Sequence, residues 1–226
     1  MEIIRLFCIV GKTGTGKSTY LNKILEDKEF LEAHNLSNLV YGTTRKKRNG
    51  EIDGVDYHFL SKYDYKQIPI NSLIEFRSYY TLNDGTIYYF TKEDYLTNGN
   101  IICITSPYQY ESYKNWIIKE NLKSEITNKI YRLYLIDLNM DLKKRINRLV
   151  SRADSDDDVY EMCRRIIQER QEDEDVKKRV YELNNPEFVG NVLCINNTED
   201  DCLDENISRI KEYIHNTCIS WLYNYD

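Results

Sequence analysis

Nine residues near the N-terminus have the types and spacing needed to hold a triphosphate. The stretch GKTGTGKST, Gly11 to Thr19, matches the pattern G-x-x-x-x-G-K-[ST] in full. Glycines let the backbone curl so that successive N–H groups point at one phosphate, and a following helix adds partial positive charge. We expect Lys17 to reach the β- and γ-phosphates and the Ser18 hydroxyl to ligate Mg²⁺. The predicted ATP-binding residues of this loop are Gly11, Thr13, Gly14, Thr15, Gly16, Lys17, Ser18 and Thr19.

The flanking sequence supplies the elements that such a loop requires. Residues Ile3–Val10 form a short apolar run, typical of a buried parallel strand. After the loop, apolar residues recur at helical spacing, at Leu21, Ile24, Leu25 and Leu31. Strand, glycine loop and helix in this order distinguish a phosphate-binding loop from a glycine-rich turn that binds nothing. The sequence therefore predicts a nucleoside triphosphate site.

A second cluster of charged and polar side chains lies in TTRKKRNGEIDGVDYHF, Thr43 to Phe59. This stretch is too polar for a core strand and has no apolar stripe for a helix. Gly50 and Gly54 predict tight turns. We therefore interpret it as an ordered, turn-rich segment that carries Arg45 and Arg48.

The same segment resembles the monophosphate-binding signature of guanylate kinases, T-T-R-x-x-R-x-G-E-x-x-G-x-D-Y-x-F, at almost every fixed position. The resemblance implies that Arg45, Arg48 and Tyr57 grip the phosphate of an acceptor nucleotide. The chemistry agrees, because guanidinium groups bind a dianionic phosphate through paired hydrogen bonds and a phenol adds a further donor. A solvated basic hairpin would explain the charges but not the agreement at so many spacings.

The resemblance continues more weakly in IEFRSYYTLNDGTIYYFT, Ile74 to Thr91, which is similar to the family's I-E-W…Y-Y-G-S/T segment. It implies that Glu75 lies against guanine, Tyr89 on the phosphate and Thr91 on the base. A carboxylate can accept from guanine N1–H and N2–H₂, and a base without those donors leaves polar groups unpaired. The alternative for Glu75 is a surface acid on an edge strand. Phe90 departs from the family, which has glycine there.

The apolar strand Ile101–Ile104 departs most from the family pattern. It ends in TSPY where the family has an acid-containing strand, L-x-I-D-x-Q-G, and Thr105 takes the position of the second base-reading acid. Thr105 is thus assigned to the acceptor site, while guanine specificity and part of the Mg²⁺ shell stay open. Asp137, after the strand Ile130–Ile136, is a possible replacement acid. We instead expect a turn or cap residue before the helix that starts near Asp141.

The segment Asp141–Ile166 resembles the family's lid, a helix followed by an arginine-bearing loop and a second helix. The resemblance implies that lid arginines cross onto the transferring phosphoryl group, where positioning and charge neutralisation dominate catalysis. A solvated arginine-rich helix face is the alternative for each. Asn197 matches the family's turn beside the ATP adenine. The predicted catalytic residues are Lys17, Arg145, Arg152 and Arg165, with Arg148 and Arg164 as register alternatives.

The length and composition of the chain limit its domain size, its binding partners and its compartment. The 226 residues, 41% of them hydrophobic, are enough for one substantial core with small inserted lobes. A net charge of −6 argues against bulk binding to nucleic acid or to an anionic membrane. Six cysteines without metal or redox spacing, among them Cys8, Cys103 and Cys194 in apolar runs, predict buried reduced thiols in a cytoplasmic protein. We expect nucleotides as partners and a monomer or homodimer.

We therefore expect an α/β fold: a P-loop NTPase three-layer core with a parallel sheet, an inserted monophosphate-binding lobe and a helical lid. The expected core comprises residues 1–37, 94–145 and 164–226, with the lobe at 38–93 and the lid at 146–163. The resemblance implies an ATP-dependent nucleoside monophosphate kinase that uses Mg²⁺ and phosphorylates GMP or dGMP.

Two alternatives to this function remain. The missing strand acid is compatible with a kinase for another (d)NMP or a modified base. Guanylate kinase-like domains also serve as non-catalytic, protein-binding scaffolds. Intact Lys17 and Ser18 count against a scaffold, which needs no phosphate-binding loop.

Overall fold

The structure is a computed structural model. It describes residues 1–47, 50–81, 85–96, 99–151, 153, 159–160, 162–167, 189–197 and 202–219. Its strands are β1 (Glu2–Gly11), β2 (Leu36–Asn38), β3 (Gly42–Thr43), β4 (His58–Phe59), β5 (Leu73–Thr81), β6 (Gly85–Lys92), β7 (Asn100–Ile104), β8 (Lys129–Asn139) and β9 (Val189–Asn196). Its helices are α1 (Lys17–Glu26), α2 (Lys28–Ala33), α3 (Lys62–Lys66), α4 (Pro107–Asn121), α5 (Ser124–Thr127), α6 (Leu142–Val150) and α8 (Leu203–Ile219), with 3₁₀ turns at Ile70–Ser72 and Glu93–Tyr95.

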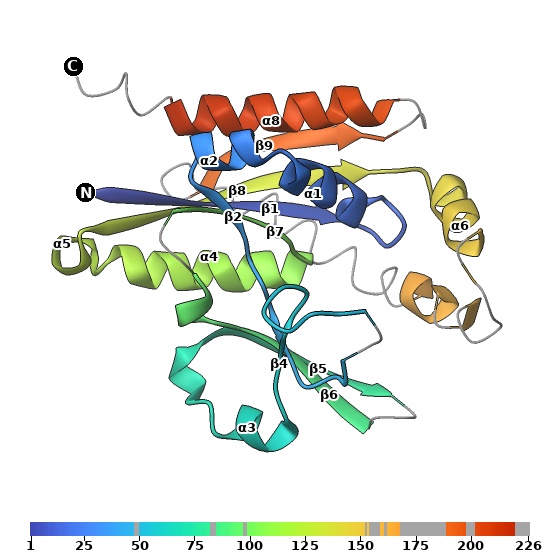
Figure 1. The fold of residues 1–226 in the computed structure, drawn as a ribbon, viewed down its shortest axis with the longest axis horizontal. Helices are drawn as coiled ribbons and strands as arrows, with labels where there is room; N and C mark the ends of the chain where they lie inside the picture. Colours follow the sequence, from blue (N-terminus) through green and yellow to red (C-terminus); the bar gives the residue numbers. More distant parts are fainter. Residues whose placement is uncertain are drawn as a thin grey trace.

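A five-stranded sheet in the order β2-β7-β1-β8-β9 forms the middle layer, and its neighbouring strands are all parallel. Successive side chains of a strand point to opposite faces. On one face, Leu6 and Cys8 of β1 pack with α4. On the other, Phe7 and Ile9 pack with α1 and α8. Figure 1 shows α8 and α4 on opposite sides of the sheet, so the expected three-layer core is confirmed.

The region after the glycine loop is helical as expected, but it divides into α1 and α2. Asp27 between them leaves the helical conformation, and its side chain accepts a hydrogen bond from the Phe30 backbone N–H at 3.0 Å. Asp27 therefore ends one helix and caps the next. The apolar spacing survives the break, because Ile24 and Leu31 both still pack in the cluster beneath α8.

Two expectations about the core strands are wrong. Asp137 is neither a turn nor a cap residue: it is buried inside β8, which pairs with β1 as far as Leu138 and with β9 as far as Asn139. The cap of the next helix is Asp141, whose carboxylate accepts from the Lys143 backbone N–H at 2.8 Å. Cys194 was expected to be buried, but it is exposed, because β9 is the edge strand of the sheet.

The described residues include all six cysteines, and each is a free thiol. Cys8 and Cys103 are buried as expected, on neighbouring strands of the central sheet. Among the helices that the structure describes, none is both long and apolar enough to span a membrane.

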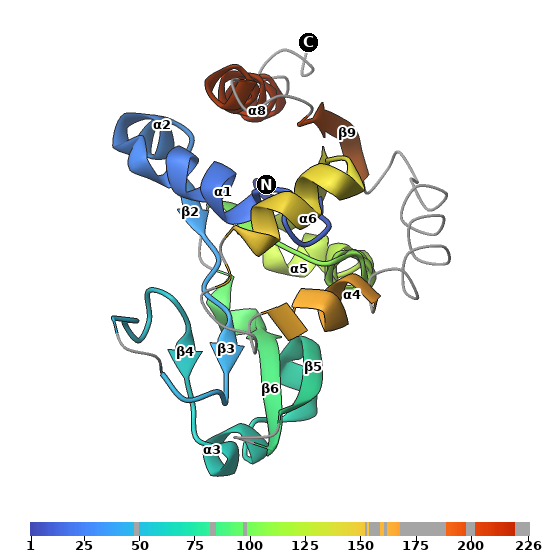
Figure 2. The same ribbon diagram turned by 90° about the vertical axis from the view of Figure 1, so that its right-hand side faces the viewer.

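A second, smaller sheet has the strand order β4-β3-β6-β5. Its strands come between β2 and β7 in the sequence, although β2 and β7 themselves pair in the central sheet. The smaller sheet falls within the stretch expected to form the inserted lobe, and Figure 2 shows it projecting from one side of the core. Phe90, which departs from the family's glycine, is fully buried here and directly faces Gly42 across the β3–β6 ladder. A Cβ atom on Gly42 would lie only 2.3 Å from the Phe90 ring. Gly42 thus provides the space that the larger side chain needs.

Replacing Gly42 with Ala should lower the free energy of unfolding by about 1–3 kcal/mol, because the Phe90 ring must move. Urea denaturation of Gly42→Ala, Phe90→Leu and the double variant would measure this. We expect the double variant to lose less than the sum of the two single losses, since the smaller leucine relieves the clash. Strictly additive losses would contradict the proposed contact.

Candidate functional site

The glycine loop after β1 curls at the carboxyl edge of the central sheet, next to α6 (Figure 1). Gly14 and Gly16 have φ values of 85° and 94°, in the left-handed region that favours glycine. The Lys17 ammonium folds back over the loop and donates to the backbone oxygens of Gly11 at 2.6 Å and Lys12 at 3.0 Å. A bound phosphate would offer Lys17 anionic oxygens in exchange for these carbonyls.

Thr15 and Asn197 support this loop from within. Thr15 is buried, and its hydroxyl donates to the Lys12 carbonyl at 2.8 Å. Asn197, which follows β9, is also buried and donates its amide to the Thr15 carbonyl at 3.3 Å. Its predicted place beside an adenine stays a prediction. Ser18 and Thr19 are exposed on the first turn of α1.

A divalent cation at this loop would be held by Ser18. Mg²⁺ prefers oxygen ligands, keeps several waters and is usually held by one or two protein oxygens together with substrate phosphates. The exposed Ser18 hydroxyl beside the loop fits that set of donors. The part of the chain that the structure describes has no group of three or more His, Cys, Asp or Glu that could hold a metal ion. Phosphate oxygens and water would complete the shell.

Two arginines on α6 lie against the loop. Arg145 is buried, and its Nε donates to the Thr13 carbonyl at 2.9 Å. The helix backbone approaches closely here, because a Cβ on Gly14 would lie 3.1 Å from the Arg145 carbonyl oxygen. One turn later, Nη1 of Arg148 lies 3.8 Å from where a Cβ on Gly16 would be. The alternative of a solvated helix face is therefore wrong for Arg145.

The other predicted lid arginines are exposed or lie outside the described residues. Arg165, and its register alternative Arg164, are exposed on the helical residues 162–167. Arg152 lies outside the described residues, so its role stays a prediction. Arg148, predicted only as a register alternative, lies beside the glycine loop.

Three of the residues predicted to hold an acceptor phosphate converge on the second sheet. The ring centroids of Tyr57 and Tyr89 are 5.9 Å apart. The guanidinium carbon of Arg45 lies 5.3 Å from the Tyr57 ring centroid. Arg48, the fourth predicted residue, lies outside the described residues. A cation and two phenols are thus close together, and all three can donate hydrogen bonds to a phosphate group.

Glu51 holds Arg45 in place. Nη1 and Nη2 of Arg45 donate to the two carboxylate oxygens of Glu51 at 2.9 and 2.7 Å, and Nη1 also donates to the Lys46 carbonyl. The hydrogen-bonded Glu51 carboxylate raises the pKa of Arg45. One bidentate edge of this guanidinium is therefore occupied, and a phosphate must use another edge or replace Glu51. Sequence reasoning missed this residue, although it is the fixed Glu of the quoted signature.

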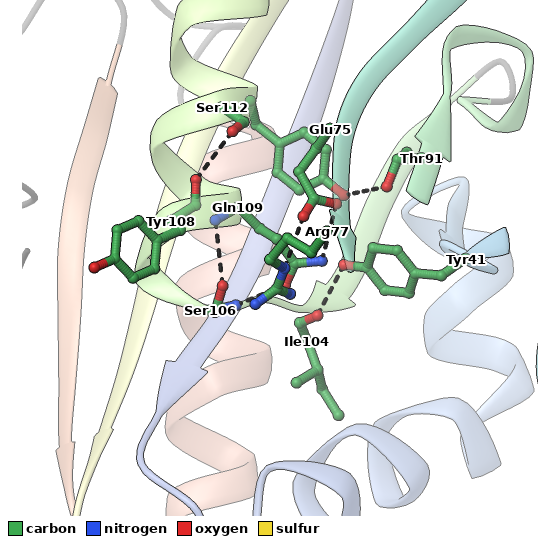
Figure 3. Close-up of polar contacts among 10 residues, drawn as sticks. Tyr41, Glu75, Arg77, Thr91, Ile104, Ser106, Tyr108, Gln109 and Ser112 are labelled. Carbon is green, nitrogen blue, oxygen red and sulfur yellow. Dashed lines mark hydrogen bonds and ion pairs between the residues drawn. The ribbon is translucent and has the colours of Figure 1, made fainter. Parts of the chain in front are cut away.

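A buried polar cluster lies where β5 and β6 meet α4 (Figure 3). Glu75 is buried although β5 is an edge strand, because the strand packs on α4, so the surface-acid alternative is wrong. Its Oε1 accepts from Arg77 Nε at 2.8 Å and its Oε2 from Gln109 Nε2 at 3.3 Å. Thr91, opposite Glu75 on β6, is fully buried, with its hydroxyl 2.9 Å from that of Tyr113.

The first turn of α4 orients the Gln109 side chain. The Ser106 hydroxyl accepts from the Gln109 backbone N–H at 3.3 Å, and the Gln109 side-chain oxygen accepts from the Ser106 backbone N–H at 2.9 Å. This reciprocal cap leaves the amide nitrogen to face Glu75 (Figure 3). Thr105, just before the cap, is buried, and its backbone N–H donates to the Ile9 carbonyl at 2.9 Å.

Sequence reasoning missed both partners of Glu75, although each had a local signal. Ser106 and Gln109 have the spacing of a capping box, S-x-x-Q. Arg77 stands two residues after Glu75, and a period of two places both on the same face of a strand.

The parallel sheet, the glycine loop at its carboxyl edge and the following helix together define a P-loop nucleotide-binding fold. Residues 4–99 match the family model described as guanylate kinase. A guanylate kinase of Chlorobium luteolum is 38% identical over 90 residues, which are 39% of this chain and 43% of that protein. One of Oceanobacillus iheyensis is 30% identical over 149 residues, 66% of this chain and 64% of that protein. Over residues 4–99 the chain is thus similar to the guanylate kinase family.

The chain spans less than two thirds of the length of these curated relatives. Among solved structures, guanylate kinase from Anaplasma phagocytophilum aligns with 95% of this chain and 86% of its own, with a TM-score of 0.43 and 15% sequence identity.

Replacing Glu51 with Gln should lower the free energy of unfolding by about 1–2 kcal/mol, because a bidentate ion pair is replaced by a hydrogen bond from the buried arginine to a neutral amide oxygen. Urea denaturation would measure the loss. Glu26→Gln is the matched control, because its pair with Lys23 is solvent-exposed and should contribute little. Equal losses in the two variants would show that Glu51 does not hold Arg45.

Proposed function

We propose that this chain is an ATP-dependent nucleoside monophosphate kinase that transfers the γ-phosphate of ATP to GMP or dGMP. The observation that best supports this is the pairing of two recognition features on one small sheet. Arg45, Tyr57 and Tyr89 offer donors for a phosphate, and Glu75 offers a buried carboxylate for a base. The P-loop of the core supplies the second phosphate site that a transfer between two nucleotides requires. The printed names of the curated relatives agree.

The arrangement on the β5–β6 ladder suits a single nucleotide. Tyr89 faces Arg77 and Thr91 faces Glu75, so the phosphate end and the base end are two residues apart along the strands. That separation is about 7 Å at the Cα atoms. The phosphate and the base of a nucleoside monophosphate are likewise separated by one ribose.

In the proposed reaction, an oxygen of the acceptor phosphate attacks the γ-phosphorus of ATP. The bond from that phosphorus to the β–γ bridging oxygen breaks, and ADP leaves. Such a transfer needs little covalent help, so positioning and charge neutralisation dominate. Lys17 holds the β- and γ-phosphates, while Arg145 and Arg148 approach the transferring group from α6. The lobe (38–93) and the lid (146–163) close over both nucleotides and exclude water.

Mg²⁺ bound with ATP supplies further neutralisation of the phosphate charge, and Ser18 is the residue that would hold it. We also propose the cytoplasm as the compartment. All six cysteines are free thiols, as expected where thiols are kept reduced.

The test is ADP release in a coupled assay with ATP, Mg²⁺ and each of the (d)NMPs in turn. We expect GMP and dGMP to be the best acceptors, and Lys17→Ala to lower kcat about a hundredfold or more, since the lost donor acts on the transferring phosphate. Lys23→Ala, on the exposed side of the same helix, is the matched control and should retain activity. If a pyrimidine monophosphate were a better acceptor than GMP and dGMP, the proposed acceptor would be wrong. If no acceptor gave ADP release, the proposed kinase activity would be wrong.

The two arginines of α6 should differ in their kinetic effects. Arg148→Met should lower kcat with little change in either KM, because it removes charge near the transferring group. Arg145→Met should also raise the KM for ATP, because Arg145 holds the loop through the Thr13 carbonyl. Lys144→Met, an exposed neighbour on the same helix, is the control. Steady-state kinetics matching that control for both variants would exclude α6 from the catalytic site.

A further inference from the structure

The carboxylate of Glu75 is already covered by hydrogen-bond donors of the protein itself. Its side chain is 3% exposed, whereas that of its partner Arg77 is 29% exposed. Figure 3 shows Arg77 reaching it from β5 and Gln109 from α4. Because the Glu75 side chain is 3% exposed, a base can reach its carboxylate only if one of the side chains that cover it moves aside.

The two donors differ in how firmly they are held. Gln109 is buried and fixed by its reciprocal cap with Ser106. The contact of Arg77 to Glu75 is the shorter one, 2.8 Å against 3.3 Å, but Arg77 is the more exposed of the two partners. A long side chain at a partly exposed position can move aside at a smaller cost than a capped, buried amide. Arg77 is thus the group that a base would displace.

The chemistry of this exchange selects among bases. A guanidinium group presents N–H donors on nitrogens that share one carbon. Guanine N1–H and N2–H₂ also share one carbon, so guanine offers Glu75 the same kind of donor edge as Arg77. Adenine and the pyrimidines do not place two such donors side by side.

We propose that Arg77 sets the base selectivity of the acceptor site by competing with the base for Glu75. This inference rests on the proposed kinase function. A base with paired N–H donors replaces what Arg77 gives up. Any other base leaves the buried acid with Gln109 as its donor but without the cation that pairs with it, which is unfavourable. Arg77 therefore adds discrimination where Thr105 stands in place of a second acid.

Arg77 also favours the ionised form of Glu75. Burial raises the pKa of Glu75, and the charge of Arg77, with the hydrogen bonds from Gln109 and Arg77, opposes that rise. The other described titratable groups that interact with the charge of Glu75 are Tyr65 on α3 and Tyr113 on α4. Burial raises the pKa of both phenols, so they stay neutral and do not take over the role of Arg77.

Loss of Arg77 should thus shift the site toward adenine. The pKa of Glu75 rises further without the neighbouring charge, so the carboxyl is protonated over a wider range of pH. A protonated carboxyl donates as well as accepts. It can pair with adenine N1 and N6–H₂, which an ionised carboxylate cannot do.

The experiment compares GMP with AMP for the wild type, Arg77→Met and Arg77→Lys at about pH 6 and about pH 8, because a carboxyl with a raised pKa is protonated to a greater extent at the lower pH. Calorimetry gives Kd, and coupled ADP release gives kcat and KM. We expect Arg77→Met to reduce the GMP preference in Kd and KM about tenfold, more at the lower pH, with a smaller change in kcat. Arg77→Lys keeps the charge and should recover most of the preference at the lower pH.

Two controls show whether Arg77 acts through Glu75. In a Glu75→Gln background no carboxyl titrates, so Arg77→Met should cause no further pH-dependent change in preference. Arg209→Met, on α8 across the sheet from the acceptor site (Figure 1), should leave the preference unaltered. Should Arg77→Met fail to fold, Arg77→Gln also removes the charge and carries the same expectation.

Three results would overturn the inference. The first is an unchanged preference in Arg77→Met at both pH values. The second is a pH-dependent effect of Arg77→Met that persists in the Glu75→Gln background. The third is a wild type that binds no nucleoside monophosphate in calorimetry, which overturns the proposed function as well. The first two leave the kinase intact, so the two failures are distinguishable.

Discussion

Strand β1 is hydrogen-bonded on both sides, to β7 along Leu6–Ile9 and to β8 along Glu2–Gly11. Because β1 is parallel to both neighbours, its carboxyl end lies at the same edge of the sheet as theirs, at the point where the strand order reverses. That constraint fixes where the glycine loop begins and how α1 departs from it. It also brings Asn197 and α6 to the loop, since both follow strands that end at the same edge.

Three charged side chains of the candidate site are paired within the protein. Lys17 donates to two loop carbonyls, Arg45 is held by Glu51, and Glu75 by Arg77 and Gln109. Buried charges are costly unless they are paired, so a protein with open ligand sites must supply such partners. Ligand binding at these positions is therefore an exchange of hydrogen bonds. Selectivity then depends on whether the incoming group replaces what the protein gives up.

Local patterns in the sequence predicted the features that depend on local geometry. The P-loop and the turns at Gly50 and Gly54 follow from spacing within a short stretch. The resemblance to the family signature implied that Arg45 and Tyr57 lie together. The buried apolar runs likewise predicted the central strands. Features that depend on distant contacts were missed or misjudged. Asp137 is in a strand because β1 and β9 extend that far on either side, and no residue near it signals this.

The proposed base end of the acceptor site shows how one local change can alter a whole site. The resemblance to the family expects an acid where β7 ends, but TSPYQ begins a helix there instead. Ser106 caps that helix, and the cap orients Gln109 so that a neutral amide donor faces Glu75. With one acid in place of two, a single cation is enough to balance the pocket, and Arg77 supplies it from the adjoining strand. Charge balance at the base end is thus kept by a pair within the lobe, Glu75 and Arg77, with α4 contributing only a neutral donor.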